Sequence, residues 1–266
     1  MMHSLFLIHF FDLQRRMISF NIAYNKMTLL LFDVDGTLAQ SGKNISRQMK
    51  TILHTLQQRG FHIGIVGGSV YQKIMIQMDG LQPEHVFSEC GCVYNKQDDV
   101  IYKKNIRFHS NYQIIQNVLK EVFCFLSDVE YKLTGHFIDL RNGLVYISLV
   151  GMNALEHERE DFLRQDAQKH YRQRLLKILT RVLEGTEFTV VKGGQVGLAV
   201  YPTEWDKSQV LHFLSDYKVI HYFGDQCEPD GNDYALFIHE RVIGHKVSSP
   251  EHTLELLKQL FKNKNQ

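Results

Sequence analysis

The stretch Leu29–Leu38, with the sequence LLLFDVDGTL, decides how the rest of this 266-residue chain is interpreted. Its apolar residues are typical of a buried strand, and two carboxylates, Asp33 and Asp35, follow at the strand end. Alternate side chains of a strand point to the same face, so the two acids start out aimed in the same direction. Gly36 allows a sharp turn. Acids in this position are costly unless they bind a cation or exchange a proton or phosphoryl group.

A simpler interpretation is a strand that ends in a helix-capping turn, because Asp and Thr are good caps. Three later segments favour the chemical interpretation. Phe61–Ser69 is a second apolar strand that ends in Gly-Gly-Ser, Trp205–Lys207 supplies a lysine, and Val219–Asp225 ends in an acid shortly before Gly231–Asp233. The four segments, in this order, resemble the signature of the haloacid dehalogenase-like phosphotransferases.

The resemblance narrows to one family. The segments DVDGTL, VGGS, FIDLRNG, GGQ, WDK and FGD with the following GND are similar to those of the eukaryotic phosphomannomutases, from about Met27 to Phe261. This implies an enzyme that interconverts mannose 6-phosphate and mannose 1-phosphate for GDP-mannose synthesis, through an aspartyl-phosphate and a hexose bisphosphate. It also implies Mg²⁺, a hexose 1,6-bisphosphate activator, and a homodimer that pairs through a cap domain.

Composition fits a folded enzyme of one or two domains, with 44% hydrophobic and 22% charged residues. The formal net charge of +1 gives no reason to expect nucleic acid or an anionic membrane as a partner. No apolar run is long enough to span a bilayer. None of the four cysteines forms a C-x-x-C pair, which predicts free thiols in the cytoplasm. A zinc site at Cys90 and Cys92 is disfavoured because no histidine lies at ligand spacing.

Residues 1–26 precede the segment that resembles the family. Ser4–Phe11 is apolar but short, and no basic residue precedes it, although a signal peptide would require one. We expect an N-terminal extension, disordered or loosely helical, that a mis-set start codon would explain. Mass spectrometry of the native N-terminus tests this, and a mature start well before Met27 would contradict the mis-set start.

The order of strands and helices predicts an α/β fold: a doubly wound, parallel-sheet (Rossmann-like) core with an inserted α+β cap domain. The core is expected to comprise residues 27–103 and 205–266. Its predicted strands are Thr28–Phe32, His62–Val66, His85–Phe87, Cys92–Tyr94, Val219–Phe223 and Val242–Lys246. Its predicted helices are Ser46–Arg59, Val70–Met78, Lys207–Leu214, Asn232–Phe237 and Pro250–Phe261.

The cap is expected to comprise residues 104–204. Asn142-Gly143, between Gly135–Arg141 and Leu144–Leu149, is a strong hairpin signal, and Gly193-Gly194 marks a second hairpin between Glu187–Lys192 and Gln195–Tyr201. Two helices are predicted, Asn111–Leu126 and one long charged helix over roughly Glu156–Glu184. A cap hinged on the core could close and exclude water, which matters when hydrolysis competes with transfer.

The resemblance implies roles for the core residues. Asp33 would be the nucleophile, Asp35 the proton donor and acceptor, and Ser69 would hold the transferred phosphoryl group, while Lys207 would balance charge. Asp33, Asp35 (through its backbone carbonyl) and Asp225 would bind Mg²⁺. Asn232 and Asp233 would support both that metal shell and Lys207. Mg²⁺ prefers such oxygen ligands.

A mutase must also hold the non-reacting phosphate, for which the planar fork of arginine is well suited. Arg141 and Arg159 match the family's phosphate-binding arginines; Asn142, beside Arg141, and Lys43 are the other predicted substrate-binding residues. The alternative for each arginine is an ordinary surface position.

Several positions depart from the family pattern. Met152 and Gly42 stand where arginines are expected, and Gly197 and Ala199 stand where Ser and Asp are expected. The second cation turn is altered at His239 and Val242. Each buried hydrogen bond that is not made costs roughly 1–3 kcal/mol in discrimination.

Three hypotheses follow. The first is an active phosphomannomutase with a changed cap, and the second is a Mg²⁺-dependent phosphatase or a sugar phosphomutase of altered substrate. The third is a non-catalytic, phosphomannomutase-like regulatory protein. The complete set of acids, hydroxyl and lysine argues against the third hypothesis. Arg141, Arg159 and the whole-chain similarity favour the first hypothesis over the second.

Overall fold

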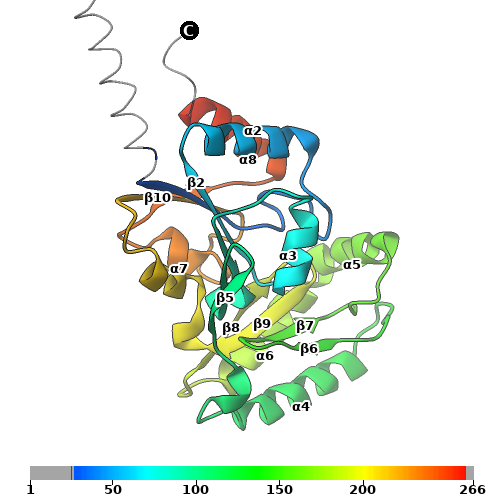
Figure 1. The fold of residues 1–266 in the computed structure, drawn as a ribbon. Coiled ribbons are helices and arrows are strands. Elements are labelled where there is room, and N and C mark those ends of the chain that lie inside the picture. Colours follow the sequence, from blue (N-terminus) through cyan, green and yellow to red (C-terminus); the bar gives the residue numbers. More distant parts are fainter. Residues whose placement is uncertain (1–24, 26, 262–266) are drawn as a thin grey trace, which may run out of the picture.

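The computed structural model describes residue 25 and residues 27–261 (Figure 1). The extension predicted over residues 1–26 lies outside the described residues, apart from Asn25. The side-chain amide of Asn25 donates a hydrogen bond to the Arg59 carbonyl at 2.9 Å. Among the described residues, none of the helices is both long and apolar enough to cross a membrane.

The larger of two sheets has seven strands in the order β11-β10-β1-β2-β3-β4-β5. Neighbouring strands from β11 to β3 are parallel, as predicted for the core. The bounds are β1 (Thr28–Phe32), β2 (His62–Val66), β3 (His85–Ser88), β4 (Val93–Lys96), β5 (Asp99–Lys103), β10 (Val219–Gly224) and β11 (Ile243–Lys246).

The predicted parallel core sheet is confirmed, and it carries two antiparallel strands at one edge. β4 pairs antiparallel with both β3 and β5, and β5 is a strand that the sequence pattern did not predict. The two residues Gln97-Asp98 join β4 to β5, and only an antiparallel pair can be joined by so short a connection. Because β5 is an exposed edge strand, its sequence carries little of the hydrophobic signal of a buried strand.

Alternate residues of β1 enter two different hydrophobic clusters, one on each face of the sheet. Leu30 and Phe32 pack on the face covered by α2 and α8, whereas Leu29 and Leu31 pack on the opposite face, with η4 and α7. Both faces are therefore buried, which explains the continuous apolar run of β1. The covering elements are α2 (Arg47–Gln58), α3 (Tyr71–Gln77), η4 (Lys207–Phe213), α7 (Tyr234–Phe237) and α8 (Pro250–Leu260).

The core helices begin where the sequence provides caps. The Ser46 hydroxyl accepts the Met49 N–H at 3.1 Å at the start of α2, and Ser249 caps α8 in the same way. Two predictions need correction. The segment that begins at Lys207 is a 3₁₀ helix and not an α-helix, and the helix expected from Asn232 begins only at Tyr234.

The smaller sheet has four antiparallel strands in the order β6-β7-β9-β8. Both predicted hairpins are confirmed, at β6 with β7 and at β8 with β9. Helices α4, α5 and α6 belong to the same part of the chain (Figure 1). The bounds are α4 (Ile114–Ser127), β6 (Ile138–Leu140), β7 (Val145–Ser148), β8 (Phe188–Gly193) and β9 (Gly197–Pro202).

The single long helix predicted over residues 156–184 is wrong. The chain forms α5 (Glu156–Lys169) and α6 (Tyr171–Val182), separated by His170 in a left-handed conformation with φ 55° and ψ 40°. The Asp166 carboxylate stabilises this break, because it accepts hydrogen bonds from the Arg172 backbone N–H at 2.8 Å and from its Nε at 2.7 Å. Neither Gly nor Pro marks the break, so the sequence pattern predicted one continuous helix.

Candidate active site

The predicted acids meet where the strand order reverses. β1 lies between β2, which follows it in sequence, and β10, which comes late in the chain. In doubly wound sheets, ligands bind at such a switch point, outside the carboxyl ends of the strands. Asp33 directly follows β1, Asp225 directly follows β10, and Ser69 lies in the loop after β2.

A buried lysine joins two of these acids. Lys207 is fully buried, and its Nζ lies 2.5 Å from Asp33 Oδ1 and 2.6 Å from Asp233 Oδ1. Asp233 is held in turn by the Tyr222 hydroxyl, which donates at 2.5 Å, and by the Gln226 N–H at 2.9 Å. The orientation of the lysine is therefore set by the fold.

The site carries more negative than positive charge. Burial raises the pKa of the Asp33 carboxyl, Asp233 and Asp225 raise it further, and Lys207 acts against them. Burial also raises the pKa of Asp225, to about 6. Burial acts to lower the pKa of Lys207, but Asp233 and Asp33 outweigh it, so that pKa is raised and the ammonium persists. Three carboxylates and one ammonium leave two negative charges, which suits a divalent cation.

Asp225 gives an independent sign that a cation fits here. Its Oδ1 is buried without a hydrogen-bond partner among the described residues, while Gln226 Nε2 donates to its Oδ2 at 2.8 Å. Carboxylate oxygens of Asp33, Asp225 and Asp233 lie within 4.8 Å of one another. Gly36, at φ +95°, leaves room for them, because a Cβ there would lie 2.5 Å from Asp225 Oδ2. This set offers the oxygen ligands that Mg²⁺ prefers.

The Asp35 carboxylate is not part of this cluster of three acids, but it lines the same cavity as Asp33 and Asp225. Its Oδ1 accepts hydrogen bonds from Gln77 Nε2 at 2.8 Å and from the Gly42 N–H at 2.9 Å. Gln77, on α3, was not among the predicted site residues. Nothing in its local sequence signals the role, because the contact spans 42 positions of the chain.

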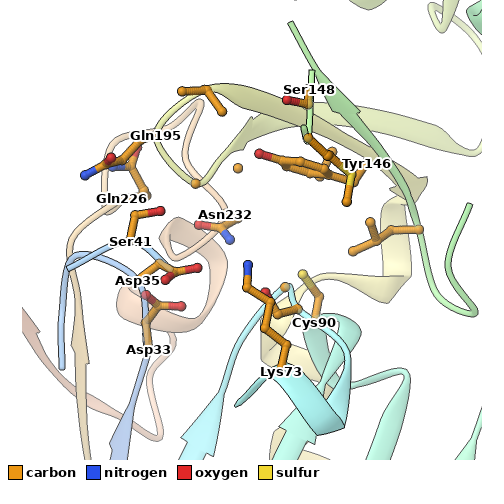
Figure 2. Close-up of a pocket in the computed structure, with 18 of the residues that line it drawn as sticks. Asp33, Asp35, Ser41, Lys73, Cys90, Tyr146, Ser148, Gln195, Gln226 and Asn232 are labelled. Carbon is orange, nitrogen blue, oxygen red and sulfur yellow. The ribbon is translucent and has the colours of Figure 1, made fainter. Parts of the chain in front are cut away.

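The acids open into a cavity of about 290 Å³ between the two sheets. Figure 2 shows Asp33, Asp35 and Asn232 on one side, and Tyr146 and Ser148 across from them on β7. Lys73 and Cys90 lie on a further side of the cavity. The pKa of the Cys90 thiol is raised to about 12 by burial, so the thiol is protonated near neutral pH. Gly68, Ser69, Arg141, Arg159, Met152, Gln195, Val196 and Ala199 also line this space.

The two predicted arginines line this cavity, and each donates hydrogen bonds to other groups of the chain. Arg141 Nε donates to Asp139 Oδ2 at 2.7 Å, and its Nη1 donates to the Gly68 carbonyl of the core at 2.6 Å. Arg159 donates from Nε to the Ala154 carbonyl at 3.1 Å. Each guanidinium is therefore positioned by its own contacts before any ligand is bound.

The structure does not bring Asn142 or Lys43 to the lining of this cavity. The Asn142 amide donates to Glu89 Oε1 at 2.8 Å, and Lys43 Nζ lies 2.5 Å from Glu156 Oε1 at the surface. Each contact joins the part of the chain that forms the larger sheet to the part, between β5 and the end of β9, that forms the smaller sheet. Lys43 also lines a shallower neighbouring groove, together with Arg159 and Gly42.

Glu89 is a positioning candidate that the sequence did not reveal. It is 2% exposed, and both carboxylate oxygens are used: Oε1 accepts from Asn142 and Oε2 accepts from the Gly143 N–H at 2.8 Å. These donors directly follow Arg141. Glu89 and Cys90 adopt positive φ angles of 52° and 58°, a conformation that costs non-glycine residues free energy. A single acid in a short apolar segment has no motif that could have indicated this contact.

Tyr146 explains one departure from the family pattern. A Cβ at Gly197 would lie 2.5 Å from Tyr146 Cζ and from the tyrosine hydroxyl oxygen. The Arg141 guanidinium lies 4.8 Å from the centre of the same ring. Glycine at position 197 therefore makes space for an aromatic side chain that lines the cavity.

Solved structures of low sequence identity share this fold. The C-terminal domain of a trehalose-6-phosphate phosphatase from C. albicans matches with a TM-score of 0.61 and 16% identity, over 92% of this chain and 96% of that chain. A haloacid dehalogenase-like hydrolase from B. subtilis matches with a TM-score of 0.59 and 15% identity, over 88% of this chain and 99% of that chain. The fold is thus that of the haloacid dehalogenase-like proteins.

Sequence comparison narrows the class further. The family model described as eukaryotic phosphomannomutase matches residues 49–263. A phosphomannomutase from Galdieria sulphuraria is 36% identical over 241 residues, which cover 88% of this chain and 94% of that relative. Phosphomannomutase 1 from Mus musculus is 32% identical, over 88% of this chain and 92% of the relative. The chain belongs to the eukaryotic phosphomannomutase family.

Proposed function

We propose that this protein is a phosphomannomutase, which interconverts mannose 6-phosphate and mannose 1-phosphate and so supplies the precursor of GDP-mannose. One observation carries the proposal. Asp33, which contacts the buried Lys207, lines one cavity together with Asp225 and with two arginines from the part of the chain that forms the smaller sheet.

Asp33 is the proposed nucleophile. One of its oxygens attacks a phosphorus of a hexose 1,6-bisphosphate, and the bond from phosphorus to the sugar oxygen breaks, which leaves an aspartyl-phosphate and a hexose monophosphate. Lys207 balances the charge that Asp33 loses and regains, because its ammonium touches both Asp33 and Asp233. The Ser69 hydroxyl donates a hydrogen bond to the transferred phosphoryl group and so holds it in place.

Asp35 is the proposed proton donor and acceptor. It protonates the leaving sugar oxygen and later removes the proton of the hydroxyl that takes the phosphoryl group back. Gln77 and the Gly42 N–H fix its carboxyl group, so that Asp35 meets successive sugar oxygens at one place. Mg²⁺, held by Asp33, Asp225 and the Asp35 carbonyl, with Asn232 and Asp233 in support, would neutralise phosphoryl charge when bound.

The inserted part of the chain supplies recognition in this proposal. Residues 104–204 act as a cap over a core of residues 27–103 and 205–266. Arg141 and Arg159 hold the non-reacting phosphate while the sugar turns end for end, with the bidentate geometry that a guanidinium allows. Asn142 supports this recognition because its hydrogen bond to Glu89 fixes the turn that follows Arg141, and Lys43 supports it through the groove beside Arg159. We further propose a cytoplasmic homodimer that pairs through the cap.

A coupled assay tests the proposal. The protein is given Mg²⁺ and mannose 1-phosphate, with and without a hexose 1,6-bisphosphate, and both mannose 6-phosphate and free phosphate are followed. Isomerisation that depends on the bisphosphate is the expected result. Absence of isomerisation with all three components present would reject the mutase proposal.

A phosphatase, or a sugar phosphomutase of altered substrate, is the second candidate. The observation in its favour is the lining of the cavity, where Met152, Val196, Ala199 and Tyr146 present apolar and aromatic surface. Free phosphate without isomerisation in the same assay would support this candidate. Neither product with any hexose phosphate would favour a regulatory protein without catalytic activity.

A further inference from the structure

A second group of metal-ligating side chains lies at the opposite end of the central strands. Ligand atoms of His62, Glu84 and His85 lie within 4.8 Å of one another. His62 begins β2 and His85 begins β3, whereas the catalytic carboxylates follow the carboxyl ends of β1 and β10. Because β2 and β3 are parallel neighbours, their first residues meet at the same edge of the sheet. This group is therefore separate from the candidate active site.

The Tyr217 hydroxyl marks the point on which the two imidazoles converge. It lies 2.6 Å from His62 Nδ1 and 2.7 Å from His85 Nε2. Tyr217 stands two residues before β10, so the contact joins three segments that are distant in sequence. Two ring nitrogens aimed at one point, with a carboxylate beside them, form the donor set of a transition-metal site.

His85 has the second contact that oriented metal ligands require. Its Nδ1 lies 2.8 Å from the Tyr94 hydroxyl, and the ring is almost completely buried between Phe87, Tyr94 and Tyr217. A histidine that binds metal through one nitrogen is typically held by a hydrogen bond at the other nitrogen. His85 thus presents Nε2 in a fixed direction without any ligand.

We propose that His62, Glu84 and His85 form a binding site for Zn²⁺, with Tyr217 or a water molecule in the fourth position. Zn²⁺ bonds of about 2.0–2.2 Å to nitrogen and oxygen require neighbouring donors to lie about 3.3 Å apart. The present spacing therefore has to contract by at most about 1.5 Å. His62 and Glu84 stand at the partly exposed rim and can provide this movement by rotating their side chains.

One positive charge faces the site. Lys96 Nζ lies 3.9 Å from Glu84 Oε1, and both side chains are partly exposed, so the pair is loose. A weak surface ion pair contributes little free energy, and Zn²⁺ can displace it. The bound ion would hold β2, β3 and the segment before β10 together. It would thus stabilise the end of the sheet that lies opposite the candidate active site.

The test uses the full-length protein with Mg²⁺ in large excess, titrated with Co²⁺ as a spectroscopic substitute for Zn²⁺. We expect one Co²⁺ per chain with the intense visible absorption of a tetrahedral site, displaced by Zn²⁺, and a higher Tm with Zn²⁺. His62→Gln and Glu84→Gln each weaken binding about tenfold or more and remove the rise in Tm. Both residues lie at the rim, so these variants should fold, whereas substitution of the buried His85 could disrupt folding.

Two variants serve as controls. His221→Gln alters another, half-buried pair of histidines, in which His221 Nδ1 lies 2.9 Å from His245 Nε2, and it should leave Co²⁺ binding unchanged. Asp225→Asn should also leave it unchanged. The proposal is wrong if the wild-type protein takes up no Co²⁺ in excess Mg²⁺, or if His62→Gln binds Co²⁺ as tightly as the wild-type protein. It is equally wrong if Asp225→Asn alone abolishes the signal.

Discussion

Asp33 is the residue on which the proposed chemistry depends. Replacement by Asn keeps the size of the side chain but removes the nucleophilic carboxylate and one of the two negative charges that Lys207 contacts. We expect Asp33→Asn to lower kcat by roughly 10³-fold or more, because the covalent route is lost. Steady-state assays with saturating Mg²⁺ and bisphosphate measure this. Asp161→Asn, on the exposed surface of α5, is the control and should keep full activity.

The second residue-scale prediction concerns Gly197 and Tyr146. Restoring the family's polar residues, by Met152→Arg, Gly197→Ser and Ala199→Asp, would be expected from sequence alone to raise mutase turnover if the substrate has changed. The structure predicts that Gly197→Ser alone does not raise turnover and instead destabilises the fold, because the serine Cβ would lie 2.5 Å from the Tyr146 ring. Overpacking of this kind typically costs about 1–3 kcal/mol.

A double-mutant cycle measures this coupling. Urea unfolding should show a loss for Gly197→Ser that is smaller by about 1 kcal/mol or more when Tyr146→Ala is also present. Additive free energies of unfolding would show that the two side chains do not compete for space.

At the scale of elements, the turn between β6 and β7 is held by Glu89. Glu89→Ala leaves the Asn142 amide and the Gly143 N–H without their acceptor, and hydrogen bonds to a charged group contribute roughly 1.5–3 kcal/mol. We expect kcat/KM for mannose 1-phosphate to fall about 10- to 100-fold, with a smaller loss for Glu89→Gln. Hydrolysis of a small aryl phosphate, which does not need Arg141, should change little. An equal loss with both substrates would mean that Glu89 acts only on folding.

The break between α5 and α6 gives a prediction on stability alone. His170 has φ 55°, a conformation that glycine adopts without strain. His170→Gly should therefore raise the free energy of unfolding by about 0.5–1 kcal/mol. Gln168→Gly, two residues earlier inside α5, should lower it by about 1 kcal/mol, because glycine is unfavourable within a helix. Urea denaturation of the two variants compares these opposite signs directly.

The whole molecule should show a pH-dependent response to Mg²⁺. Burial raises the pKa of Asp225 to about 6, well above the ordinary value of an aspartate in an unfolded chain. Without metal, ionisation of this buried group costs stability, so the contribution of Asp225 to stability is greatest at low pH and declines as pH rises from about 4 to 6. Mg²⁺ binds the ionised form, so its stabilising effect should grow over the same interval.

Thermal unfolding at about pH 5 and about pH 7, in a chelator and in Mg²⁺, measures this linkage. The rise in Tm caused by Mg²⁺ should be larger at the higher pH. Asp225→Asn should abolish most of that difference, and an equal Mg²⁺ effect at both pH values would contradict the assignment of Asp225 as a ligand.

The sequence by itself determined the architecture and the identity of the central acids. Buried parallel strands are continuous apolar runs, and the acids that follow them are recognisable because a polar group at such a place requires a chemical reason. This local pattern sufficed to predict β1, β2, β10 and both hairpins, and to single out Asp33 and Asp225. Lys207 was identified through the resemblance to the family.

Only the tertiary structure decided which groups support these acids. Gln77 reaches Asp35 across 42 positions, and Glu89 reaches Asn142 across 53 positions. Tyr146 and Gly197 are likewise coupled only through the pairing of β7 with β9. The antiparallel edge of the core sheet and the break at His170 were also missed. The three side-chain contacts join segments that are distant in sequence, and periodicity and propensity within one segment hold no information about such contacts. The two missed features of the backbone are local: β5 is exposed and lacks a hydrophobic pattern, and neither Gly nor Pro marks the break at His170.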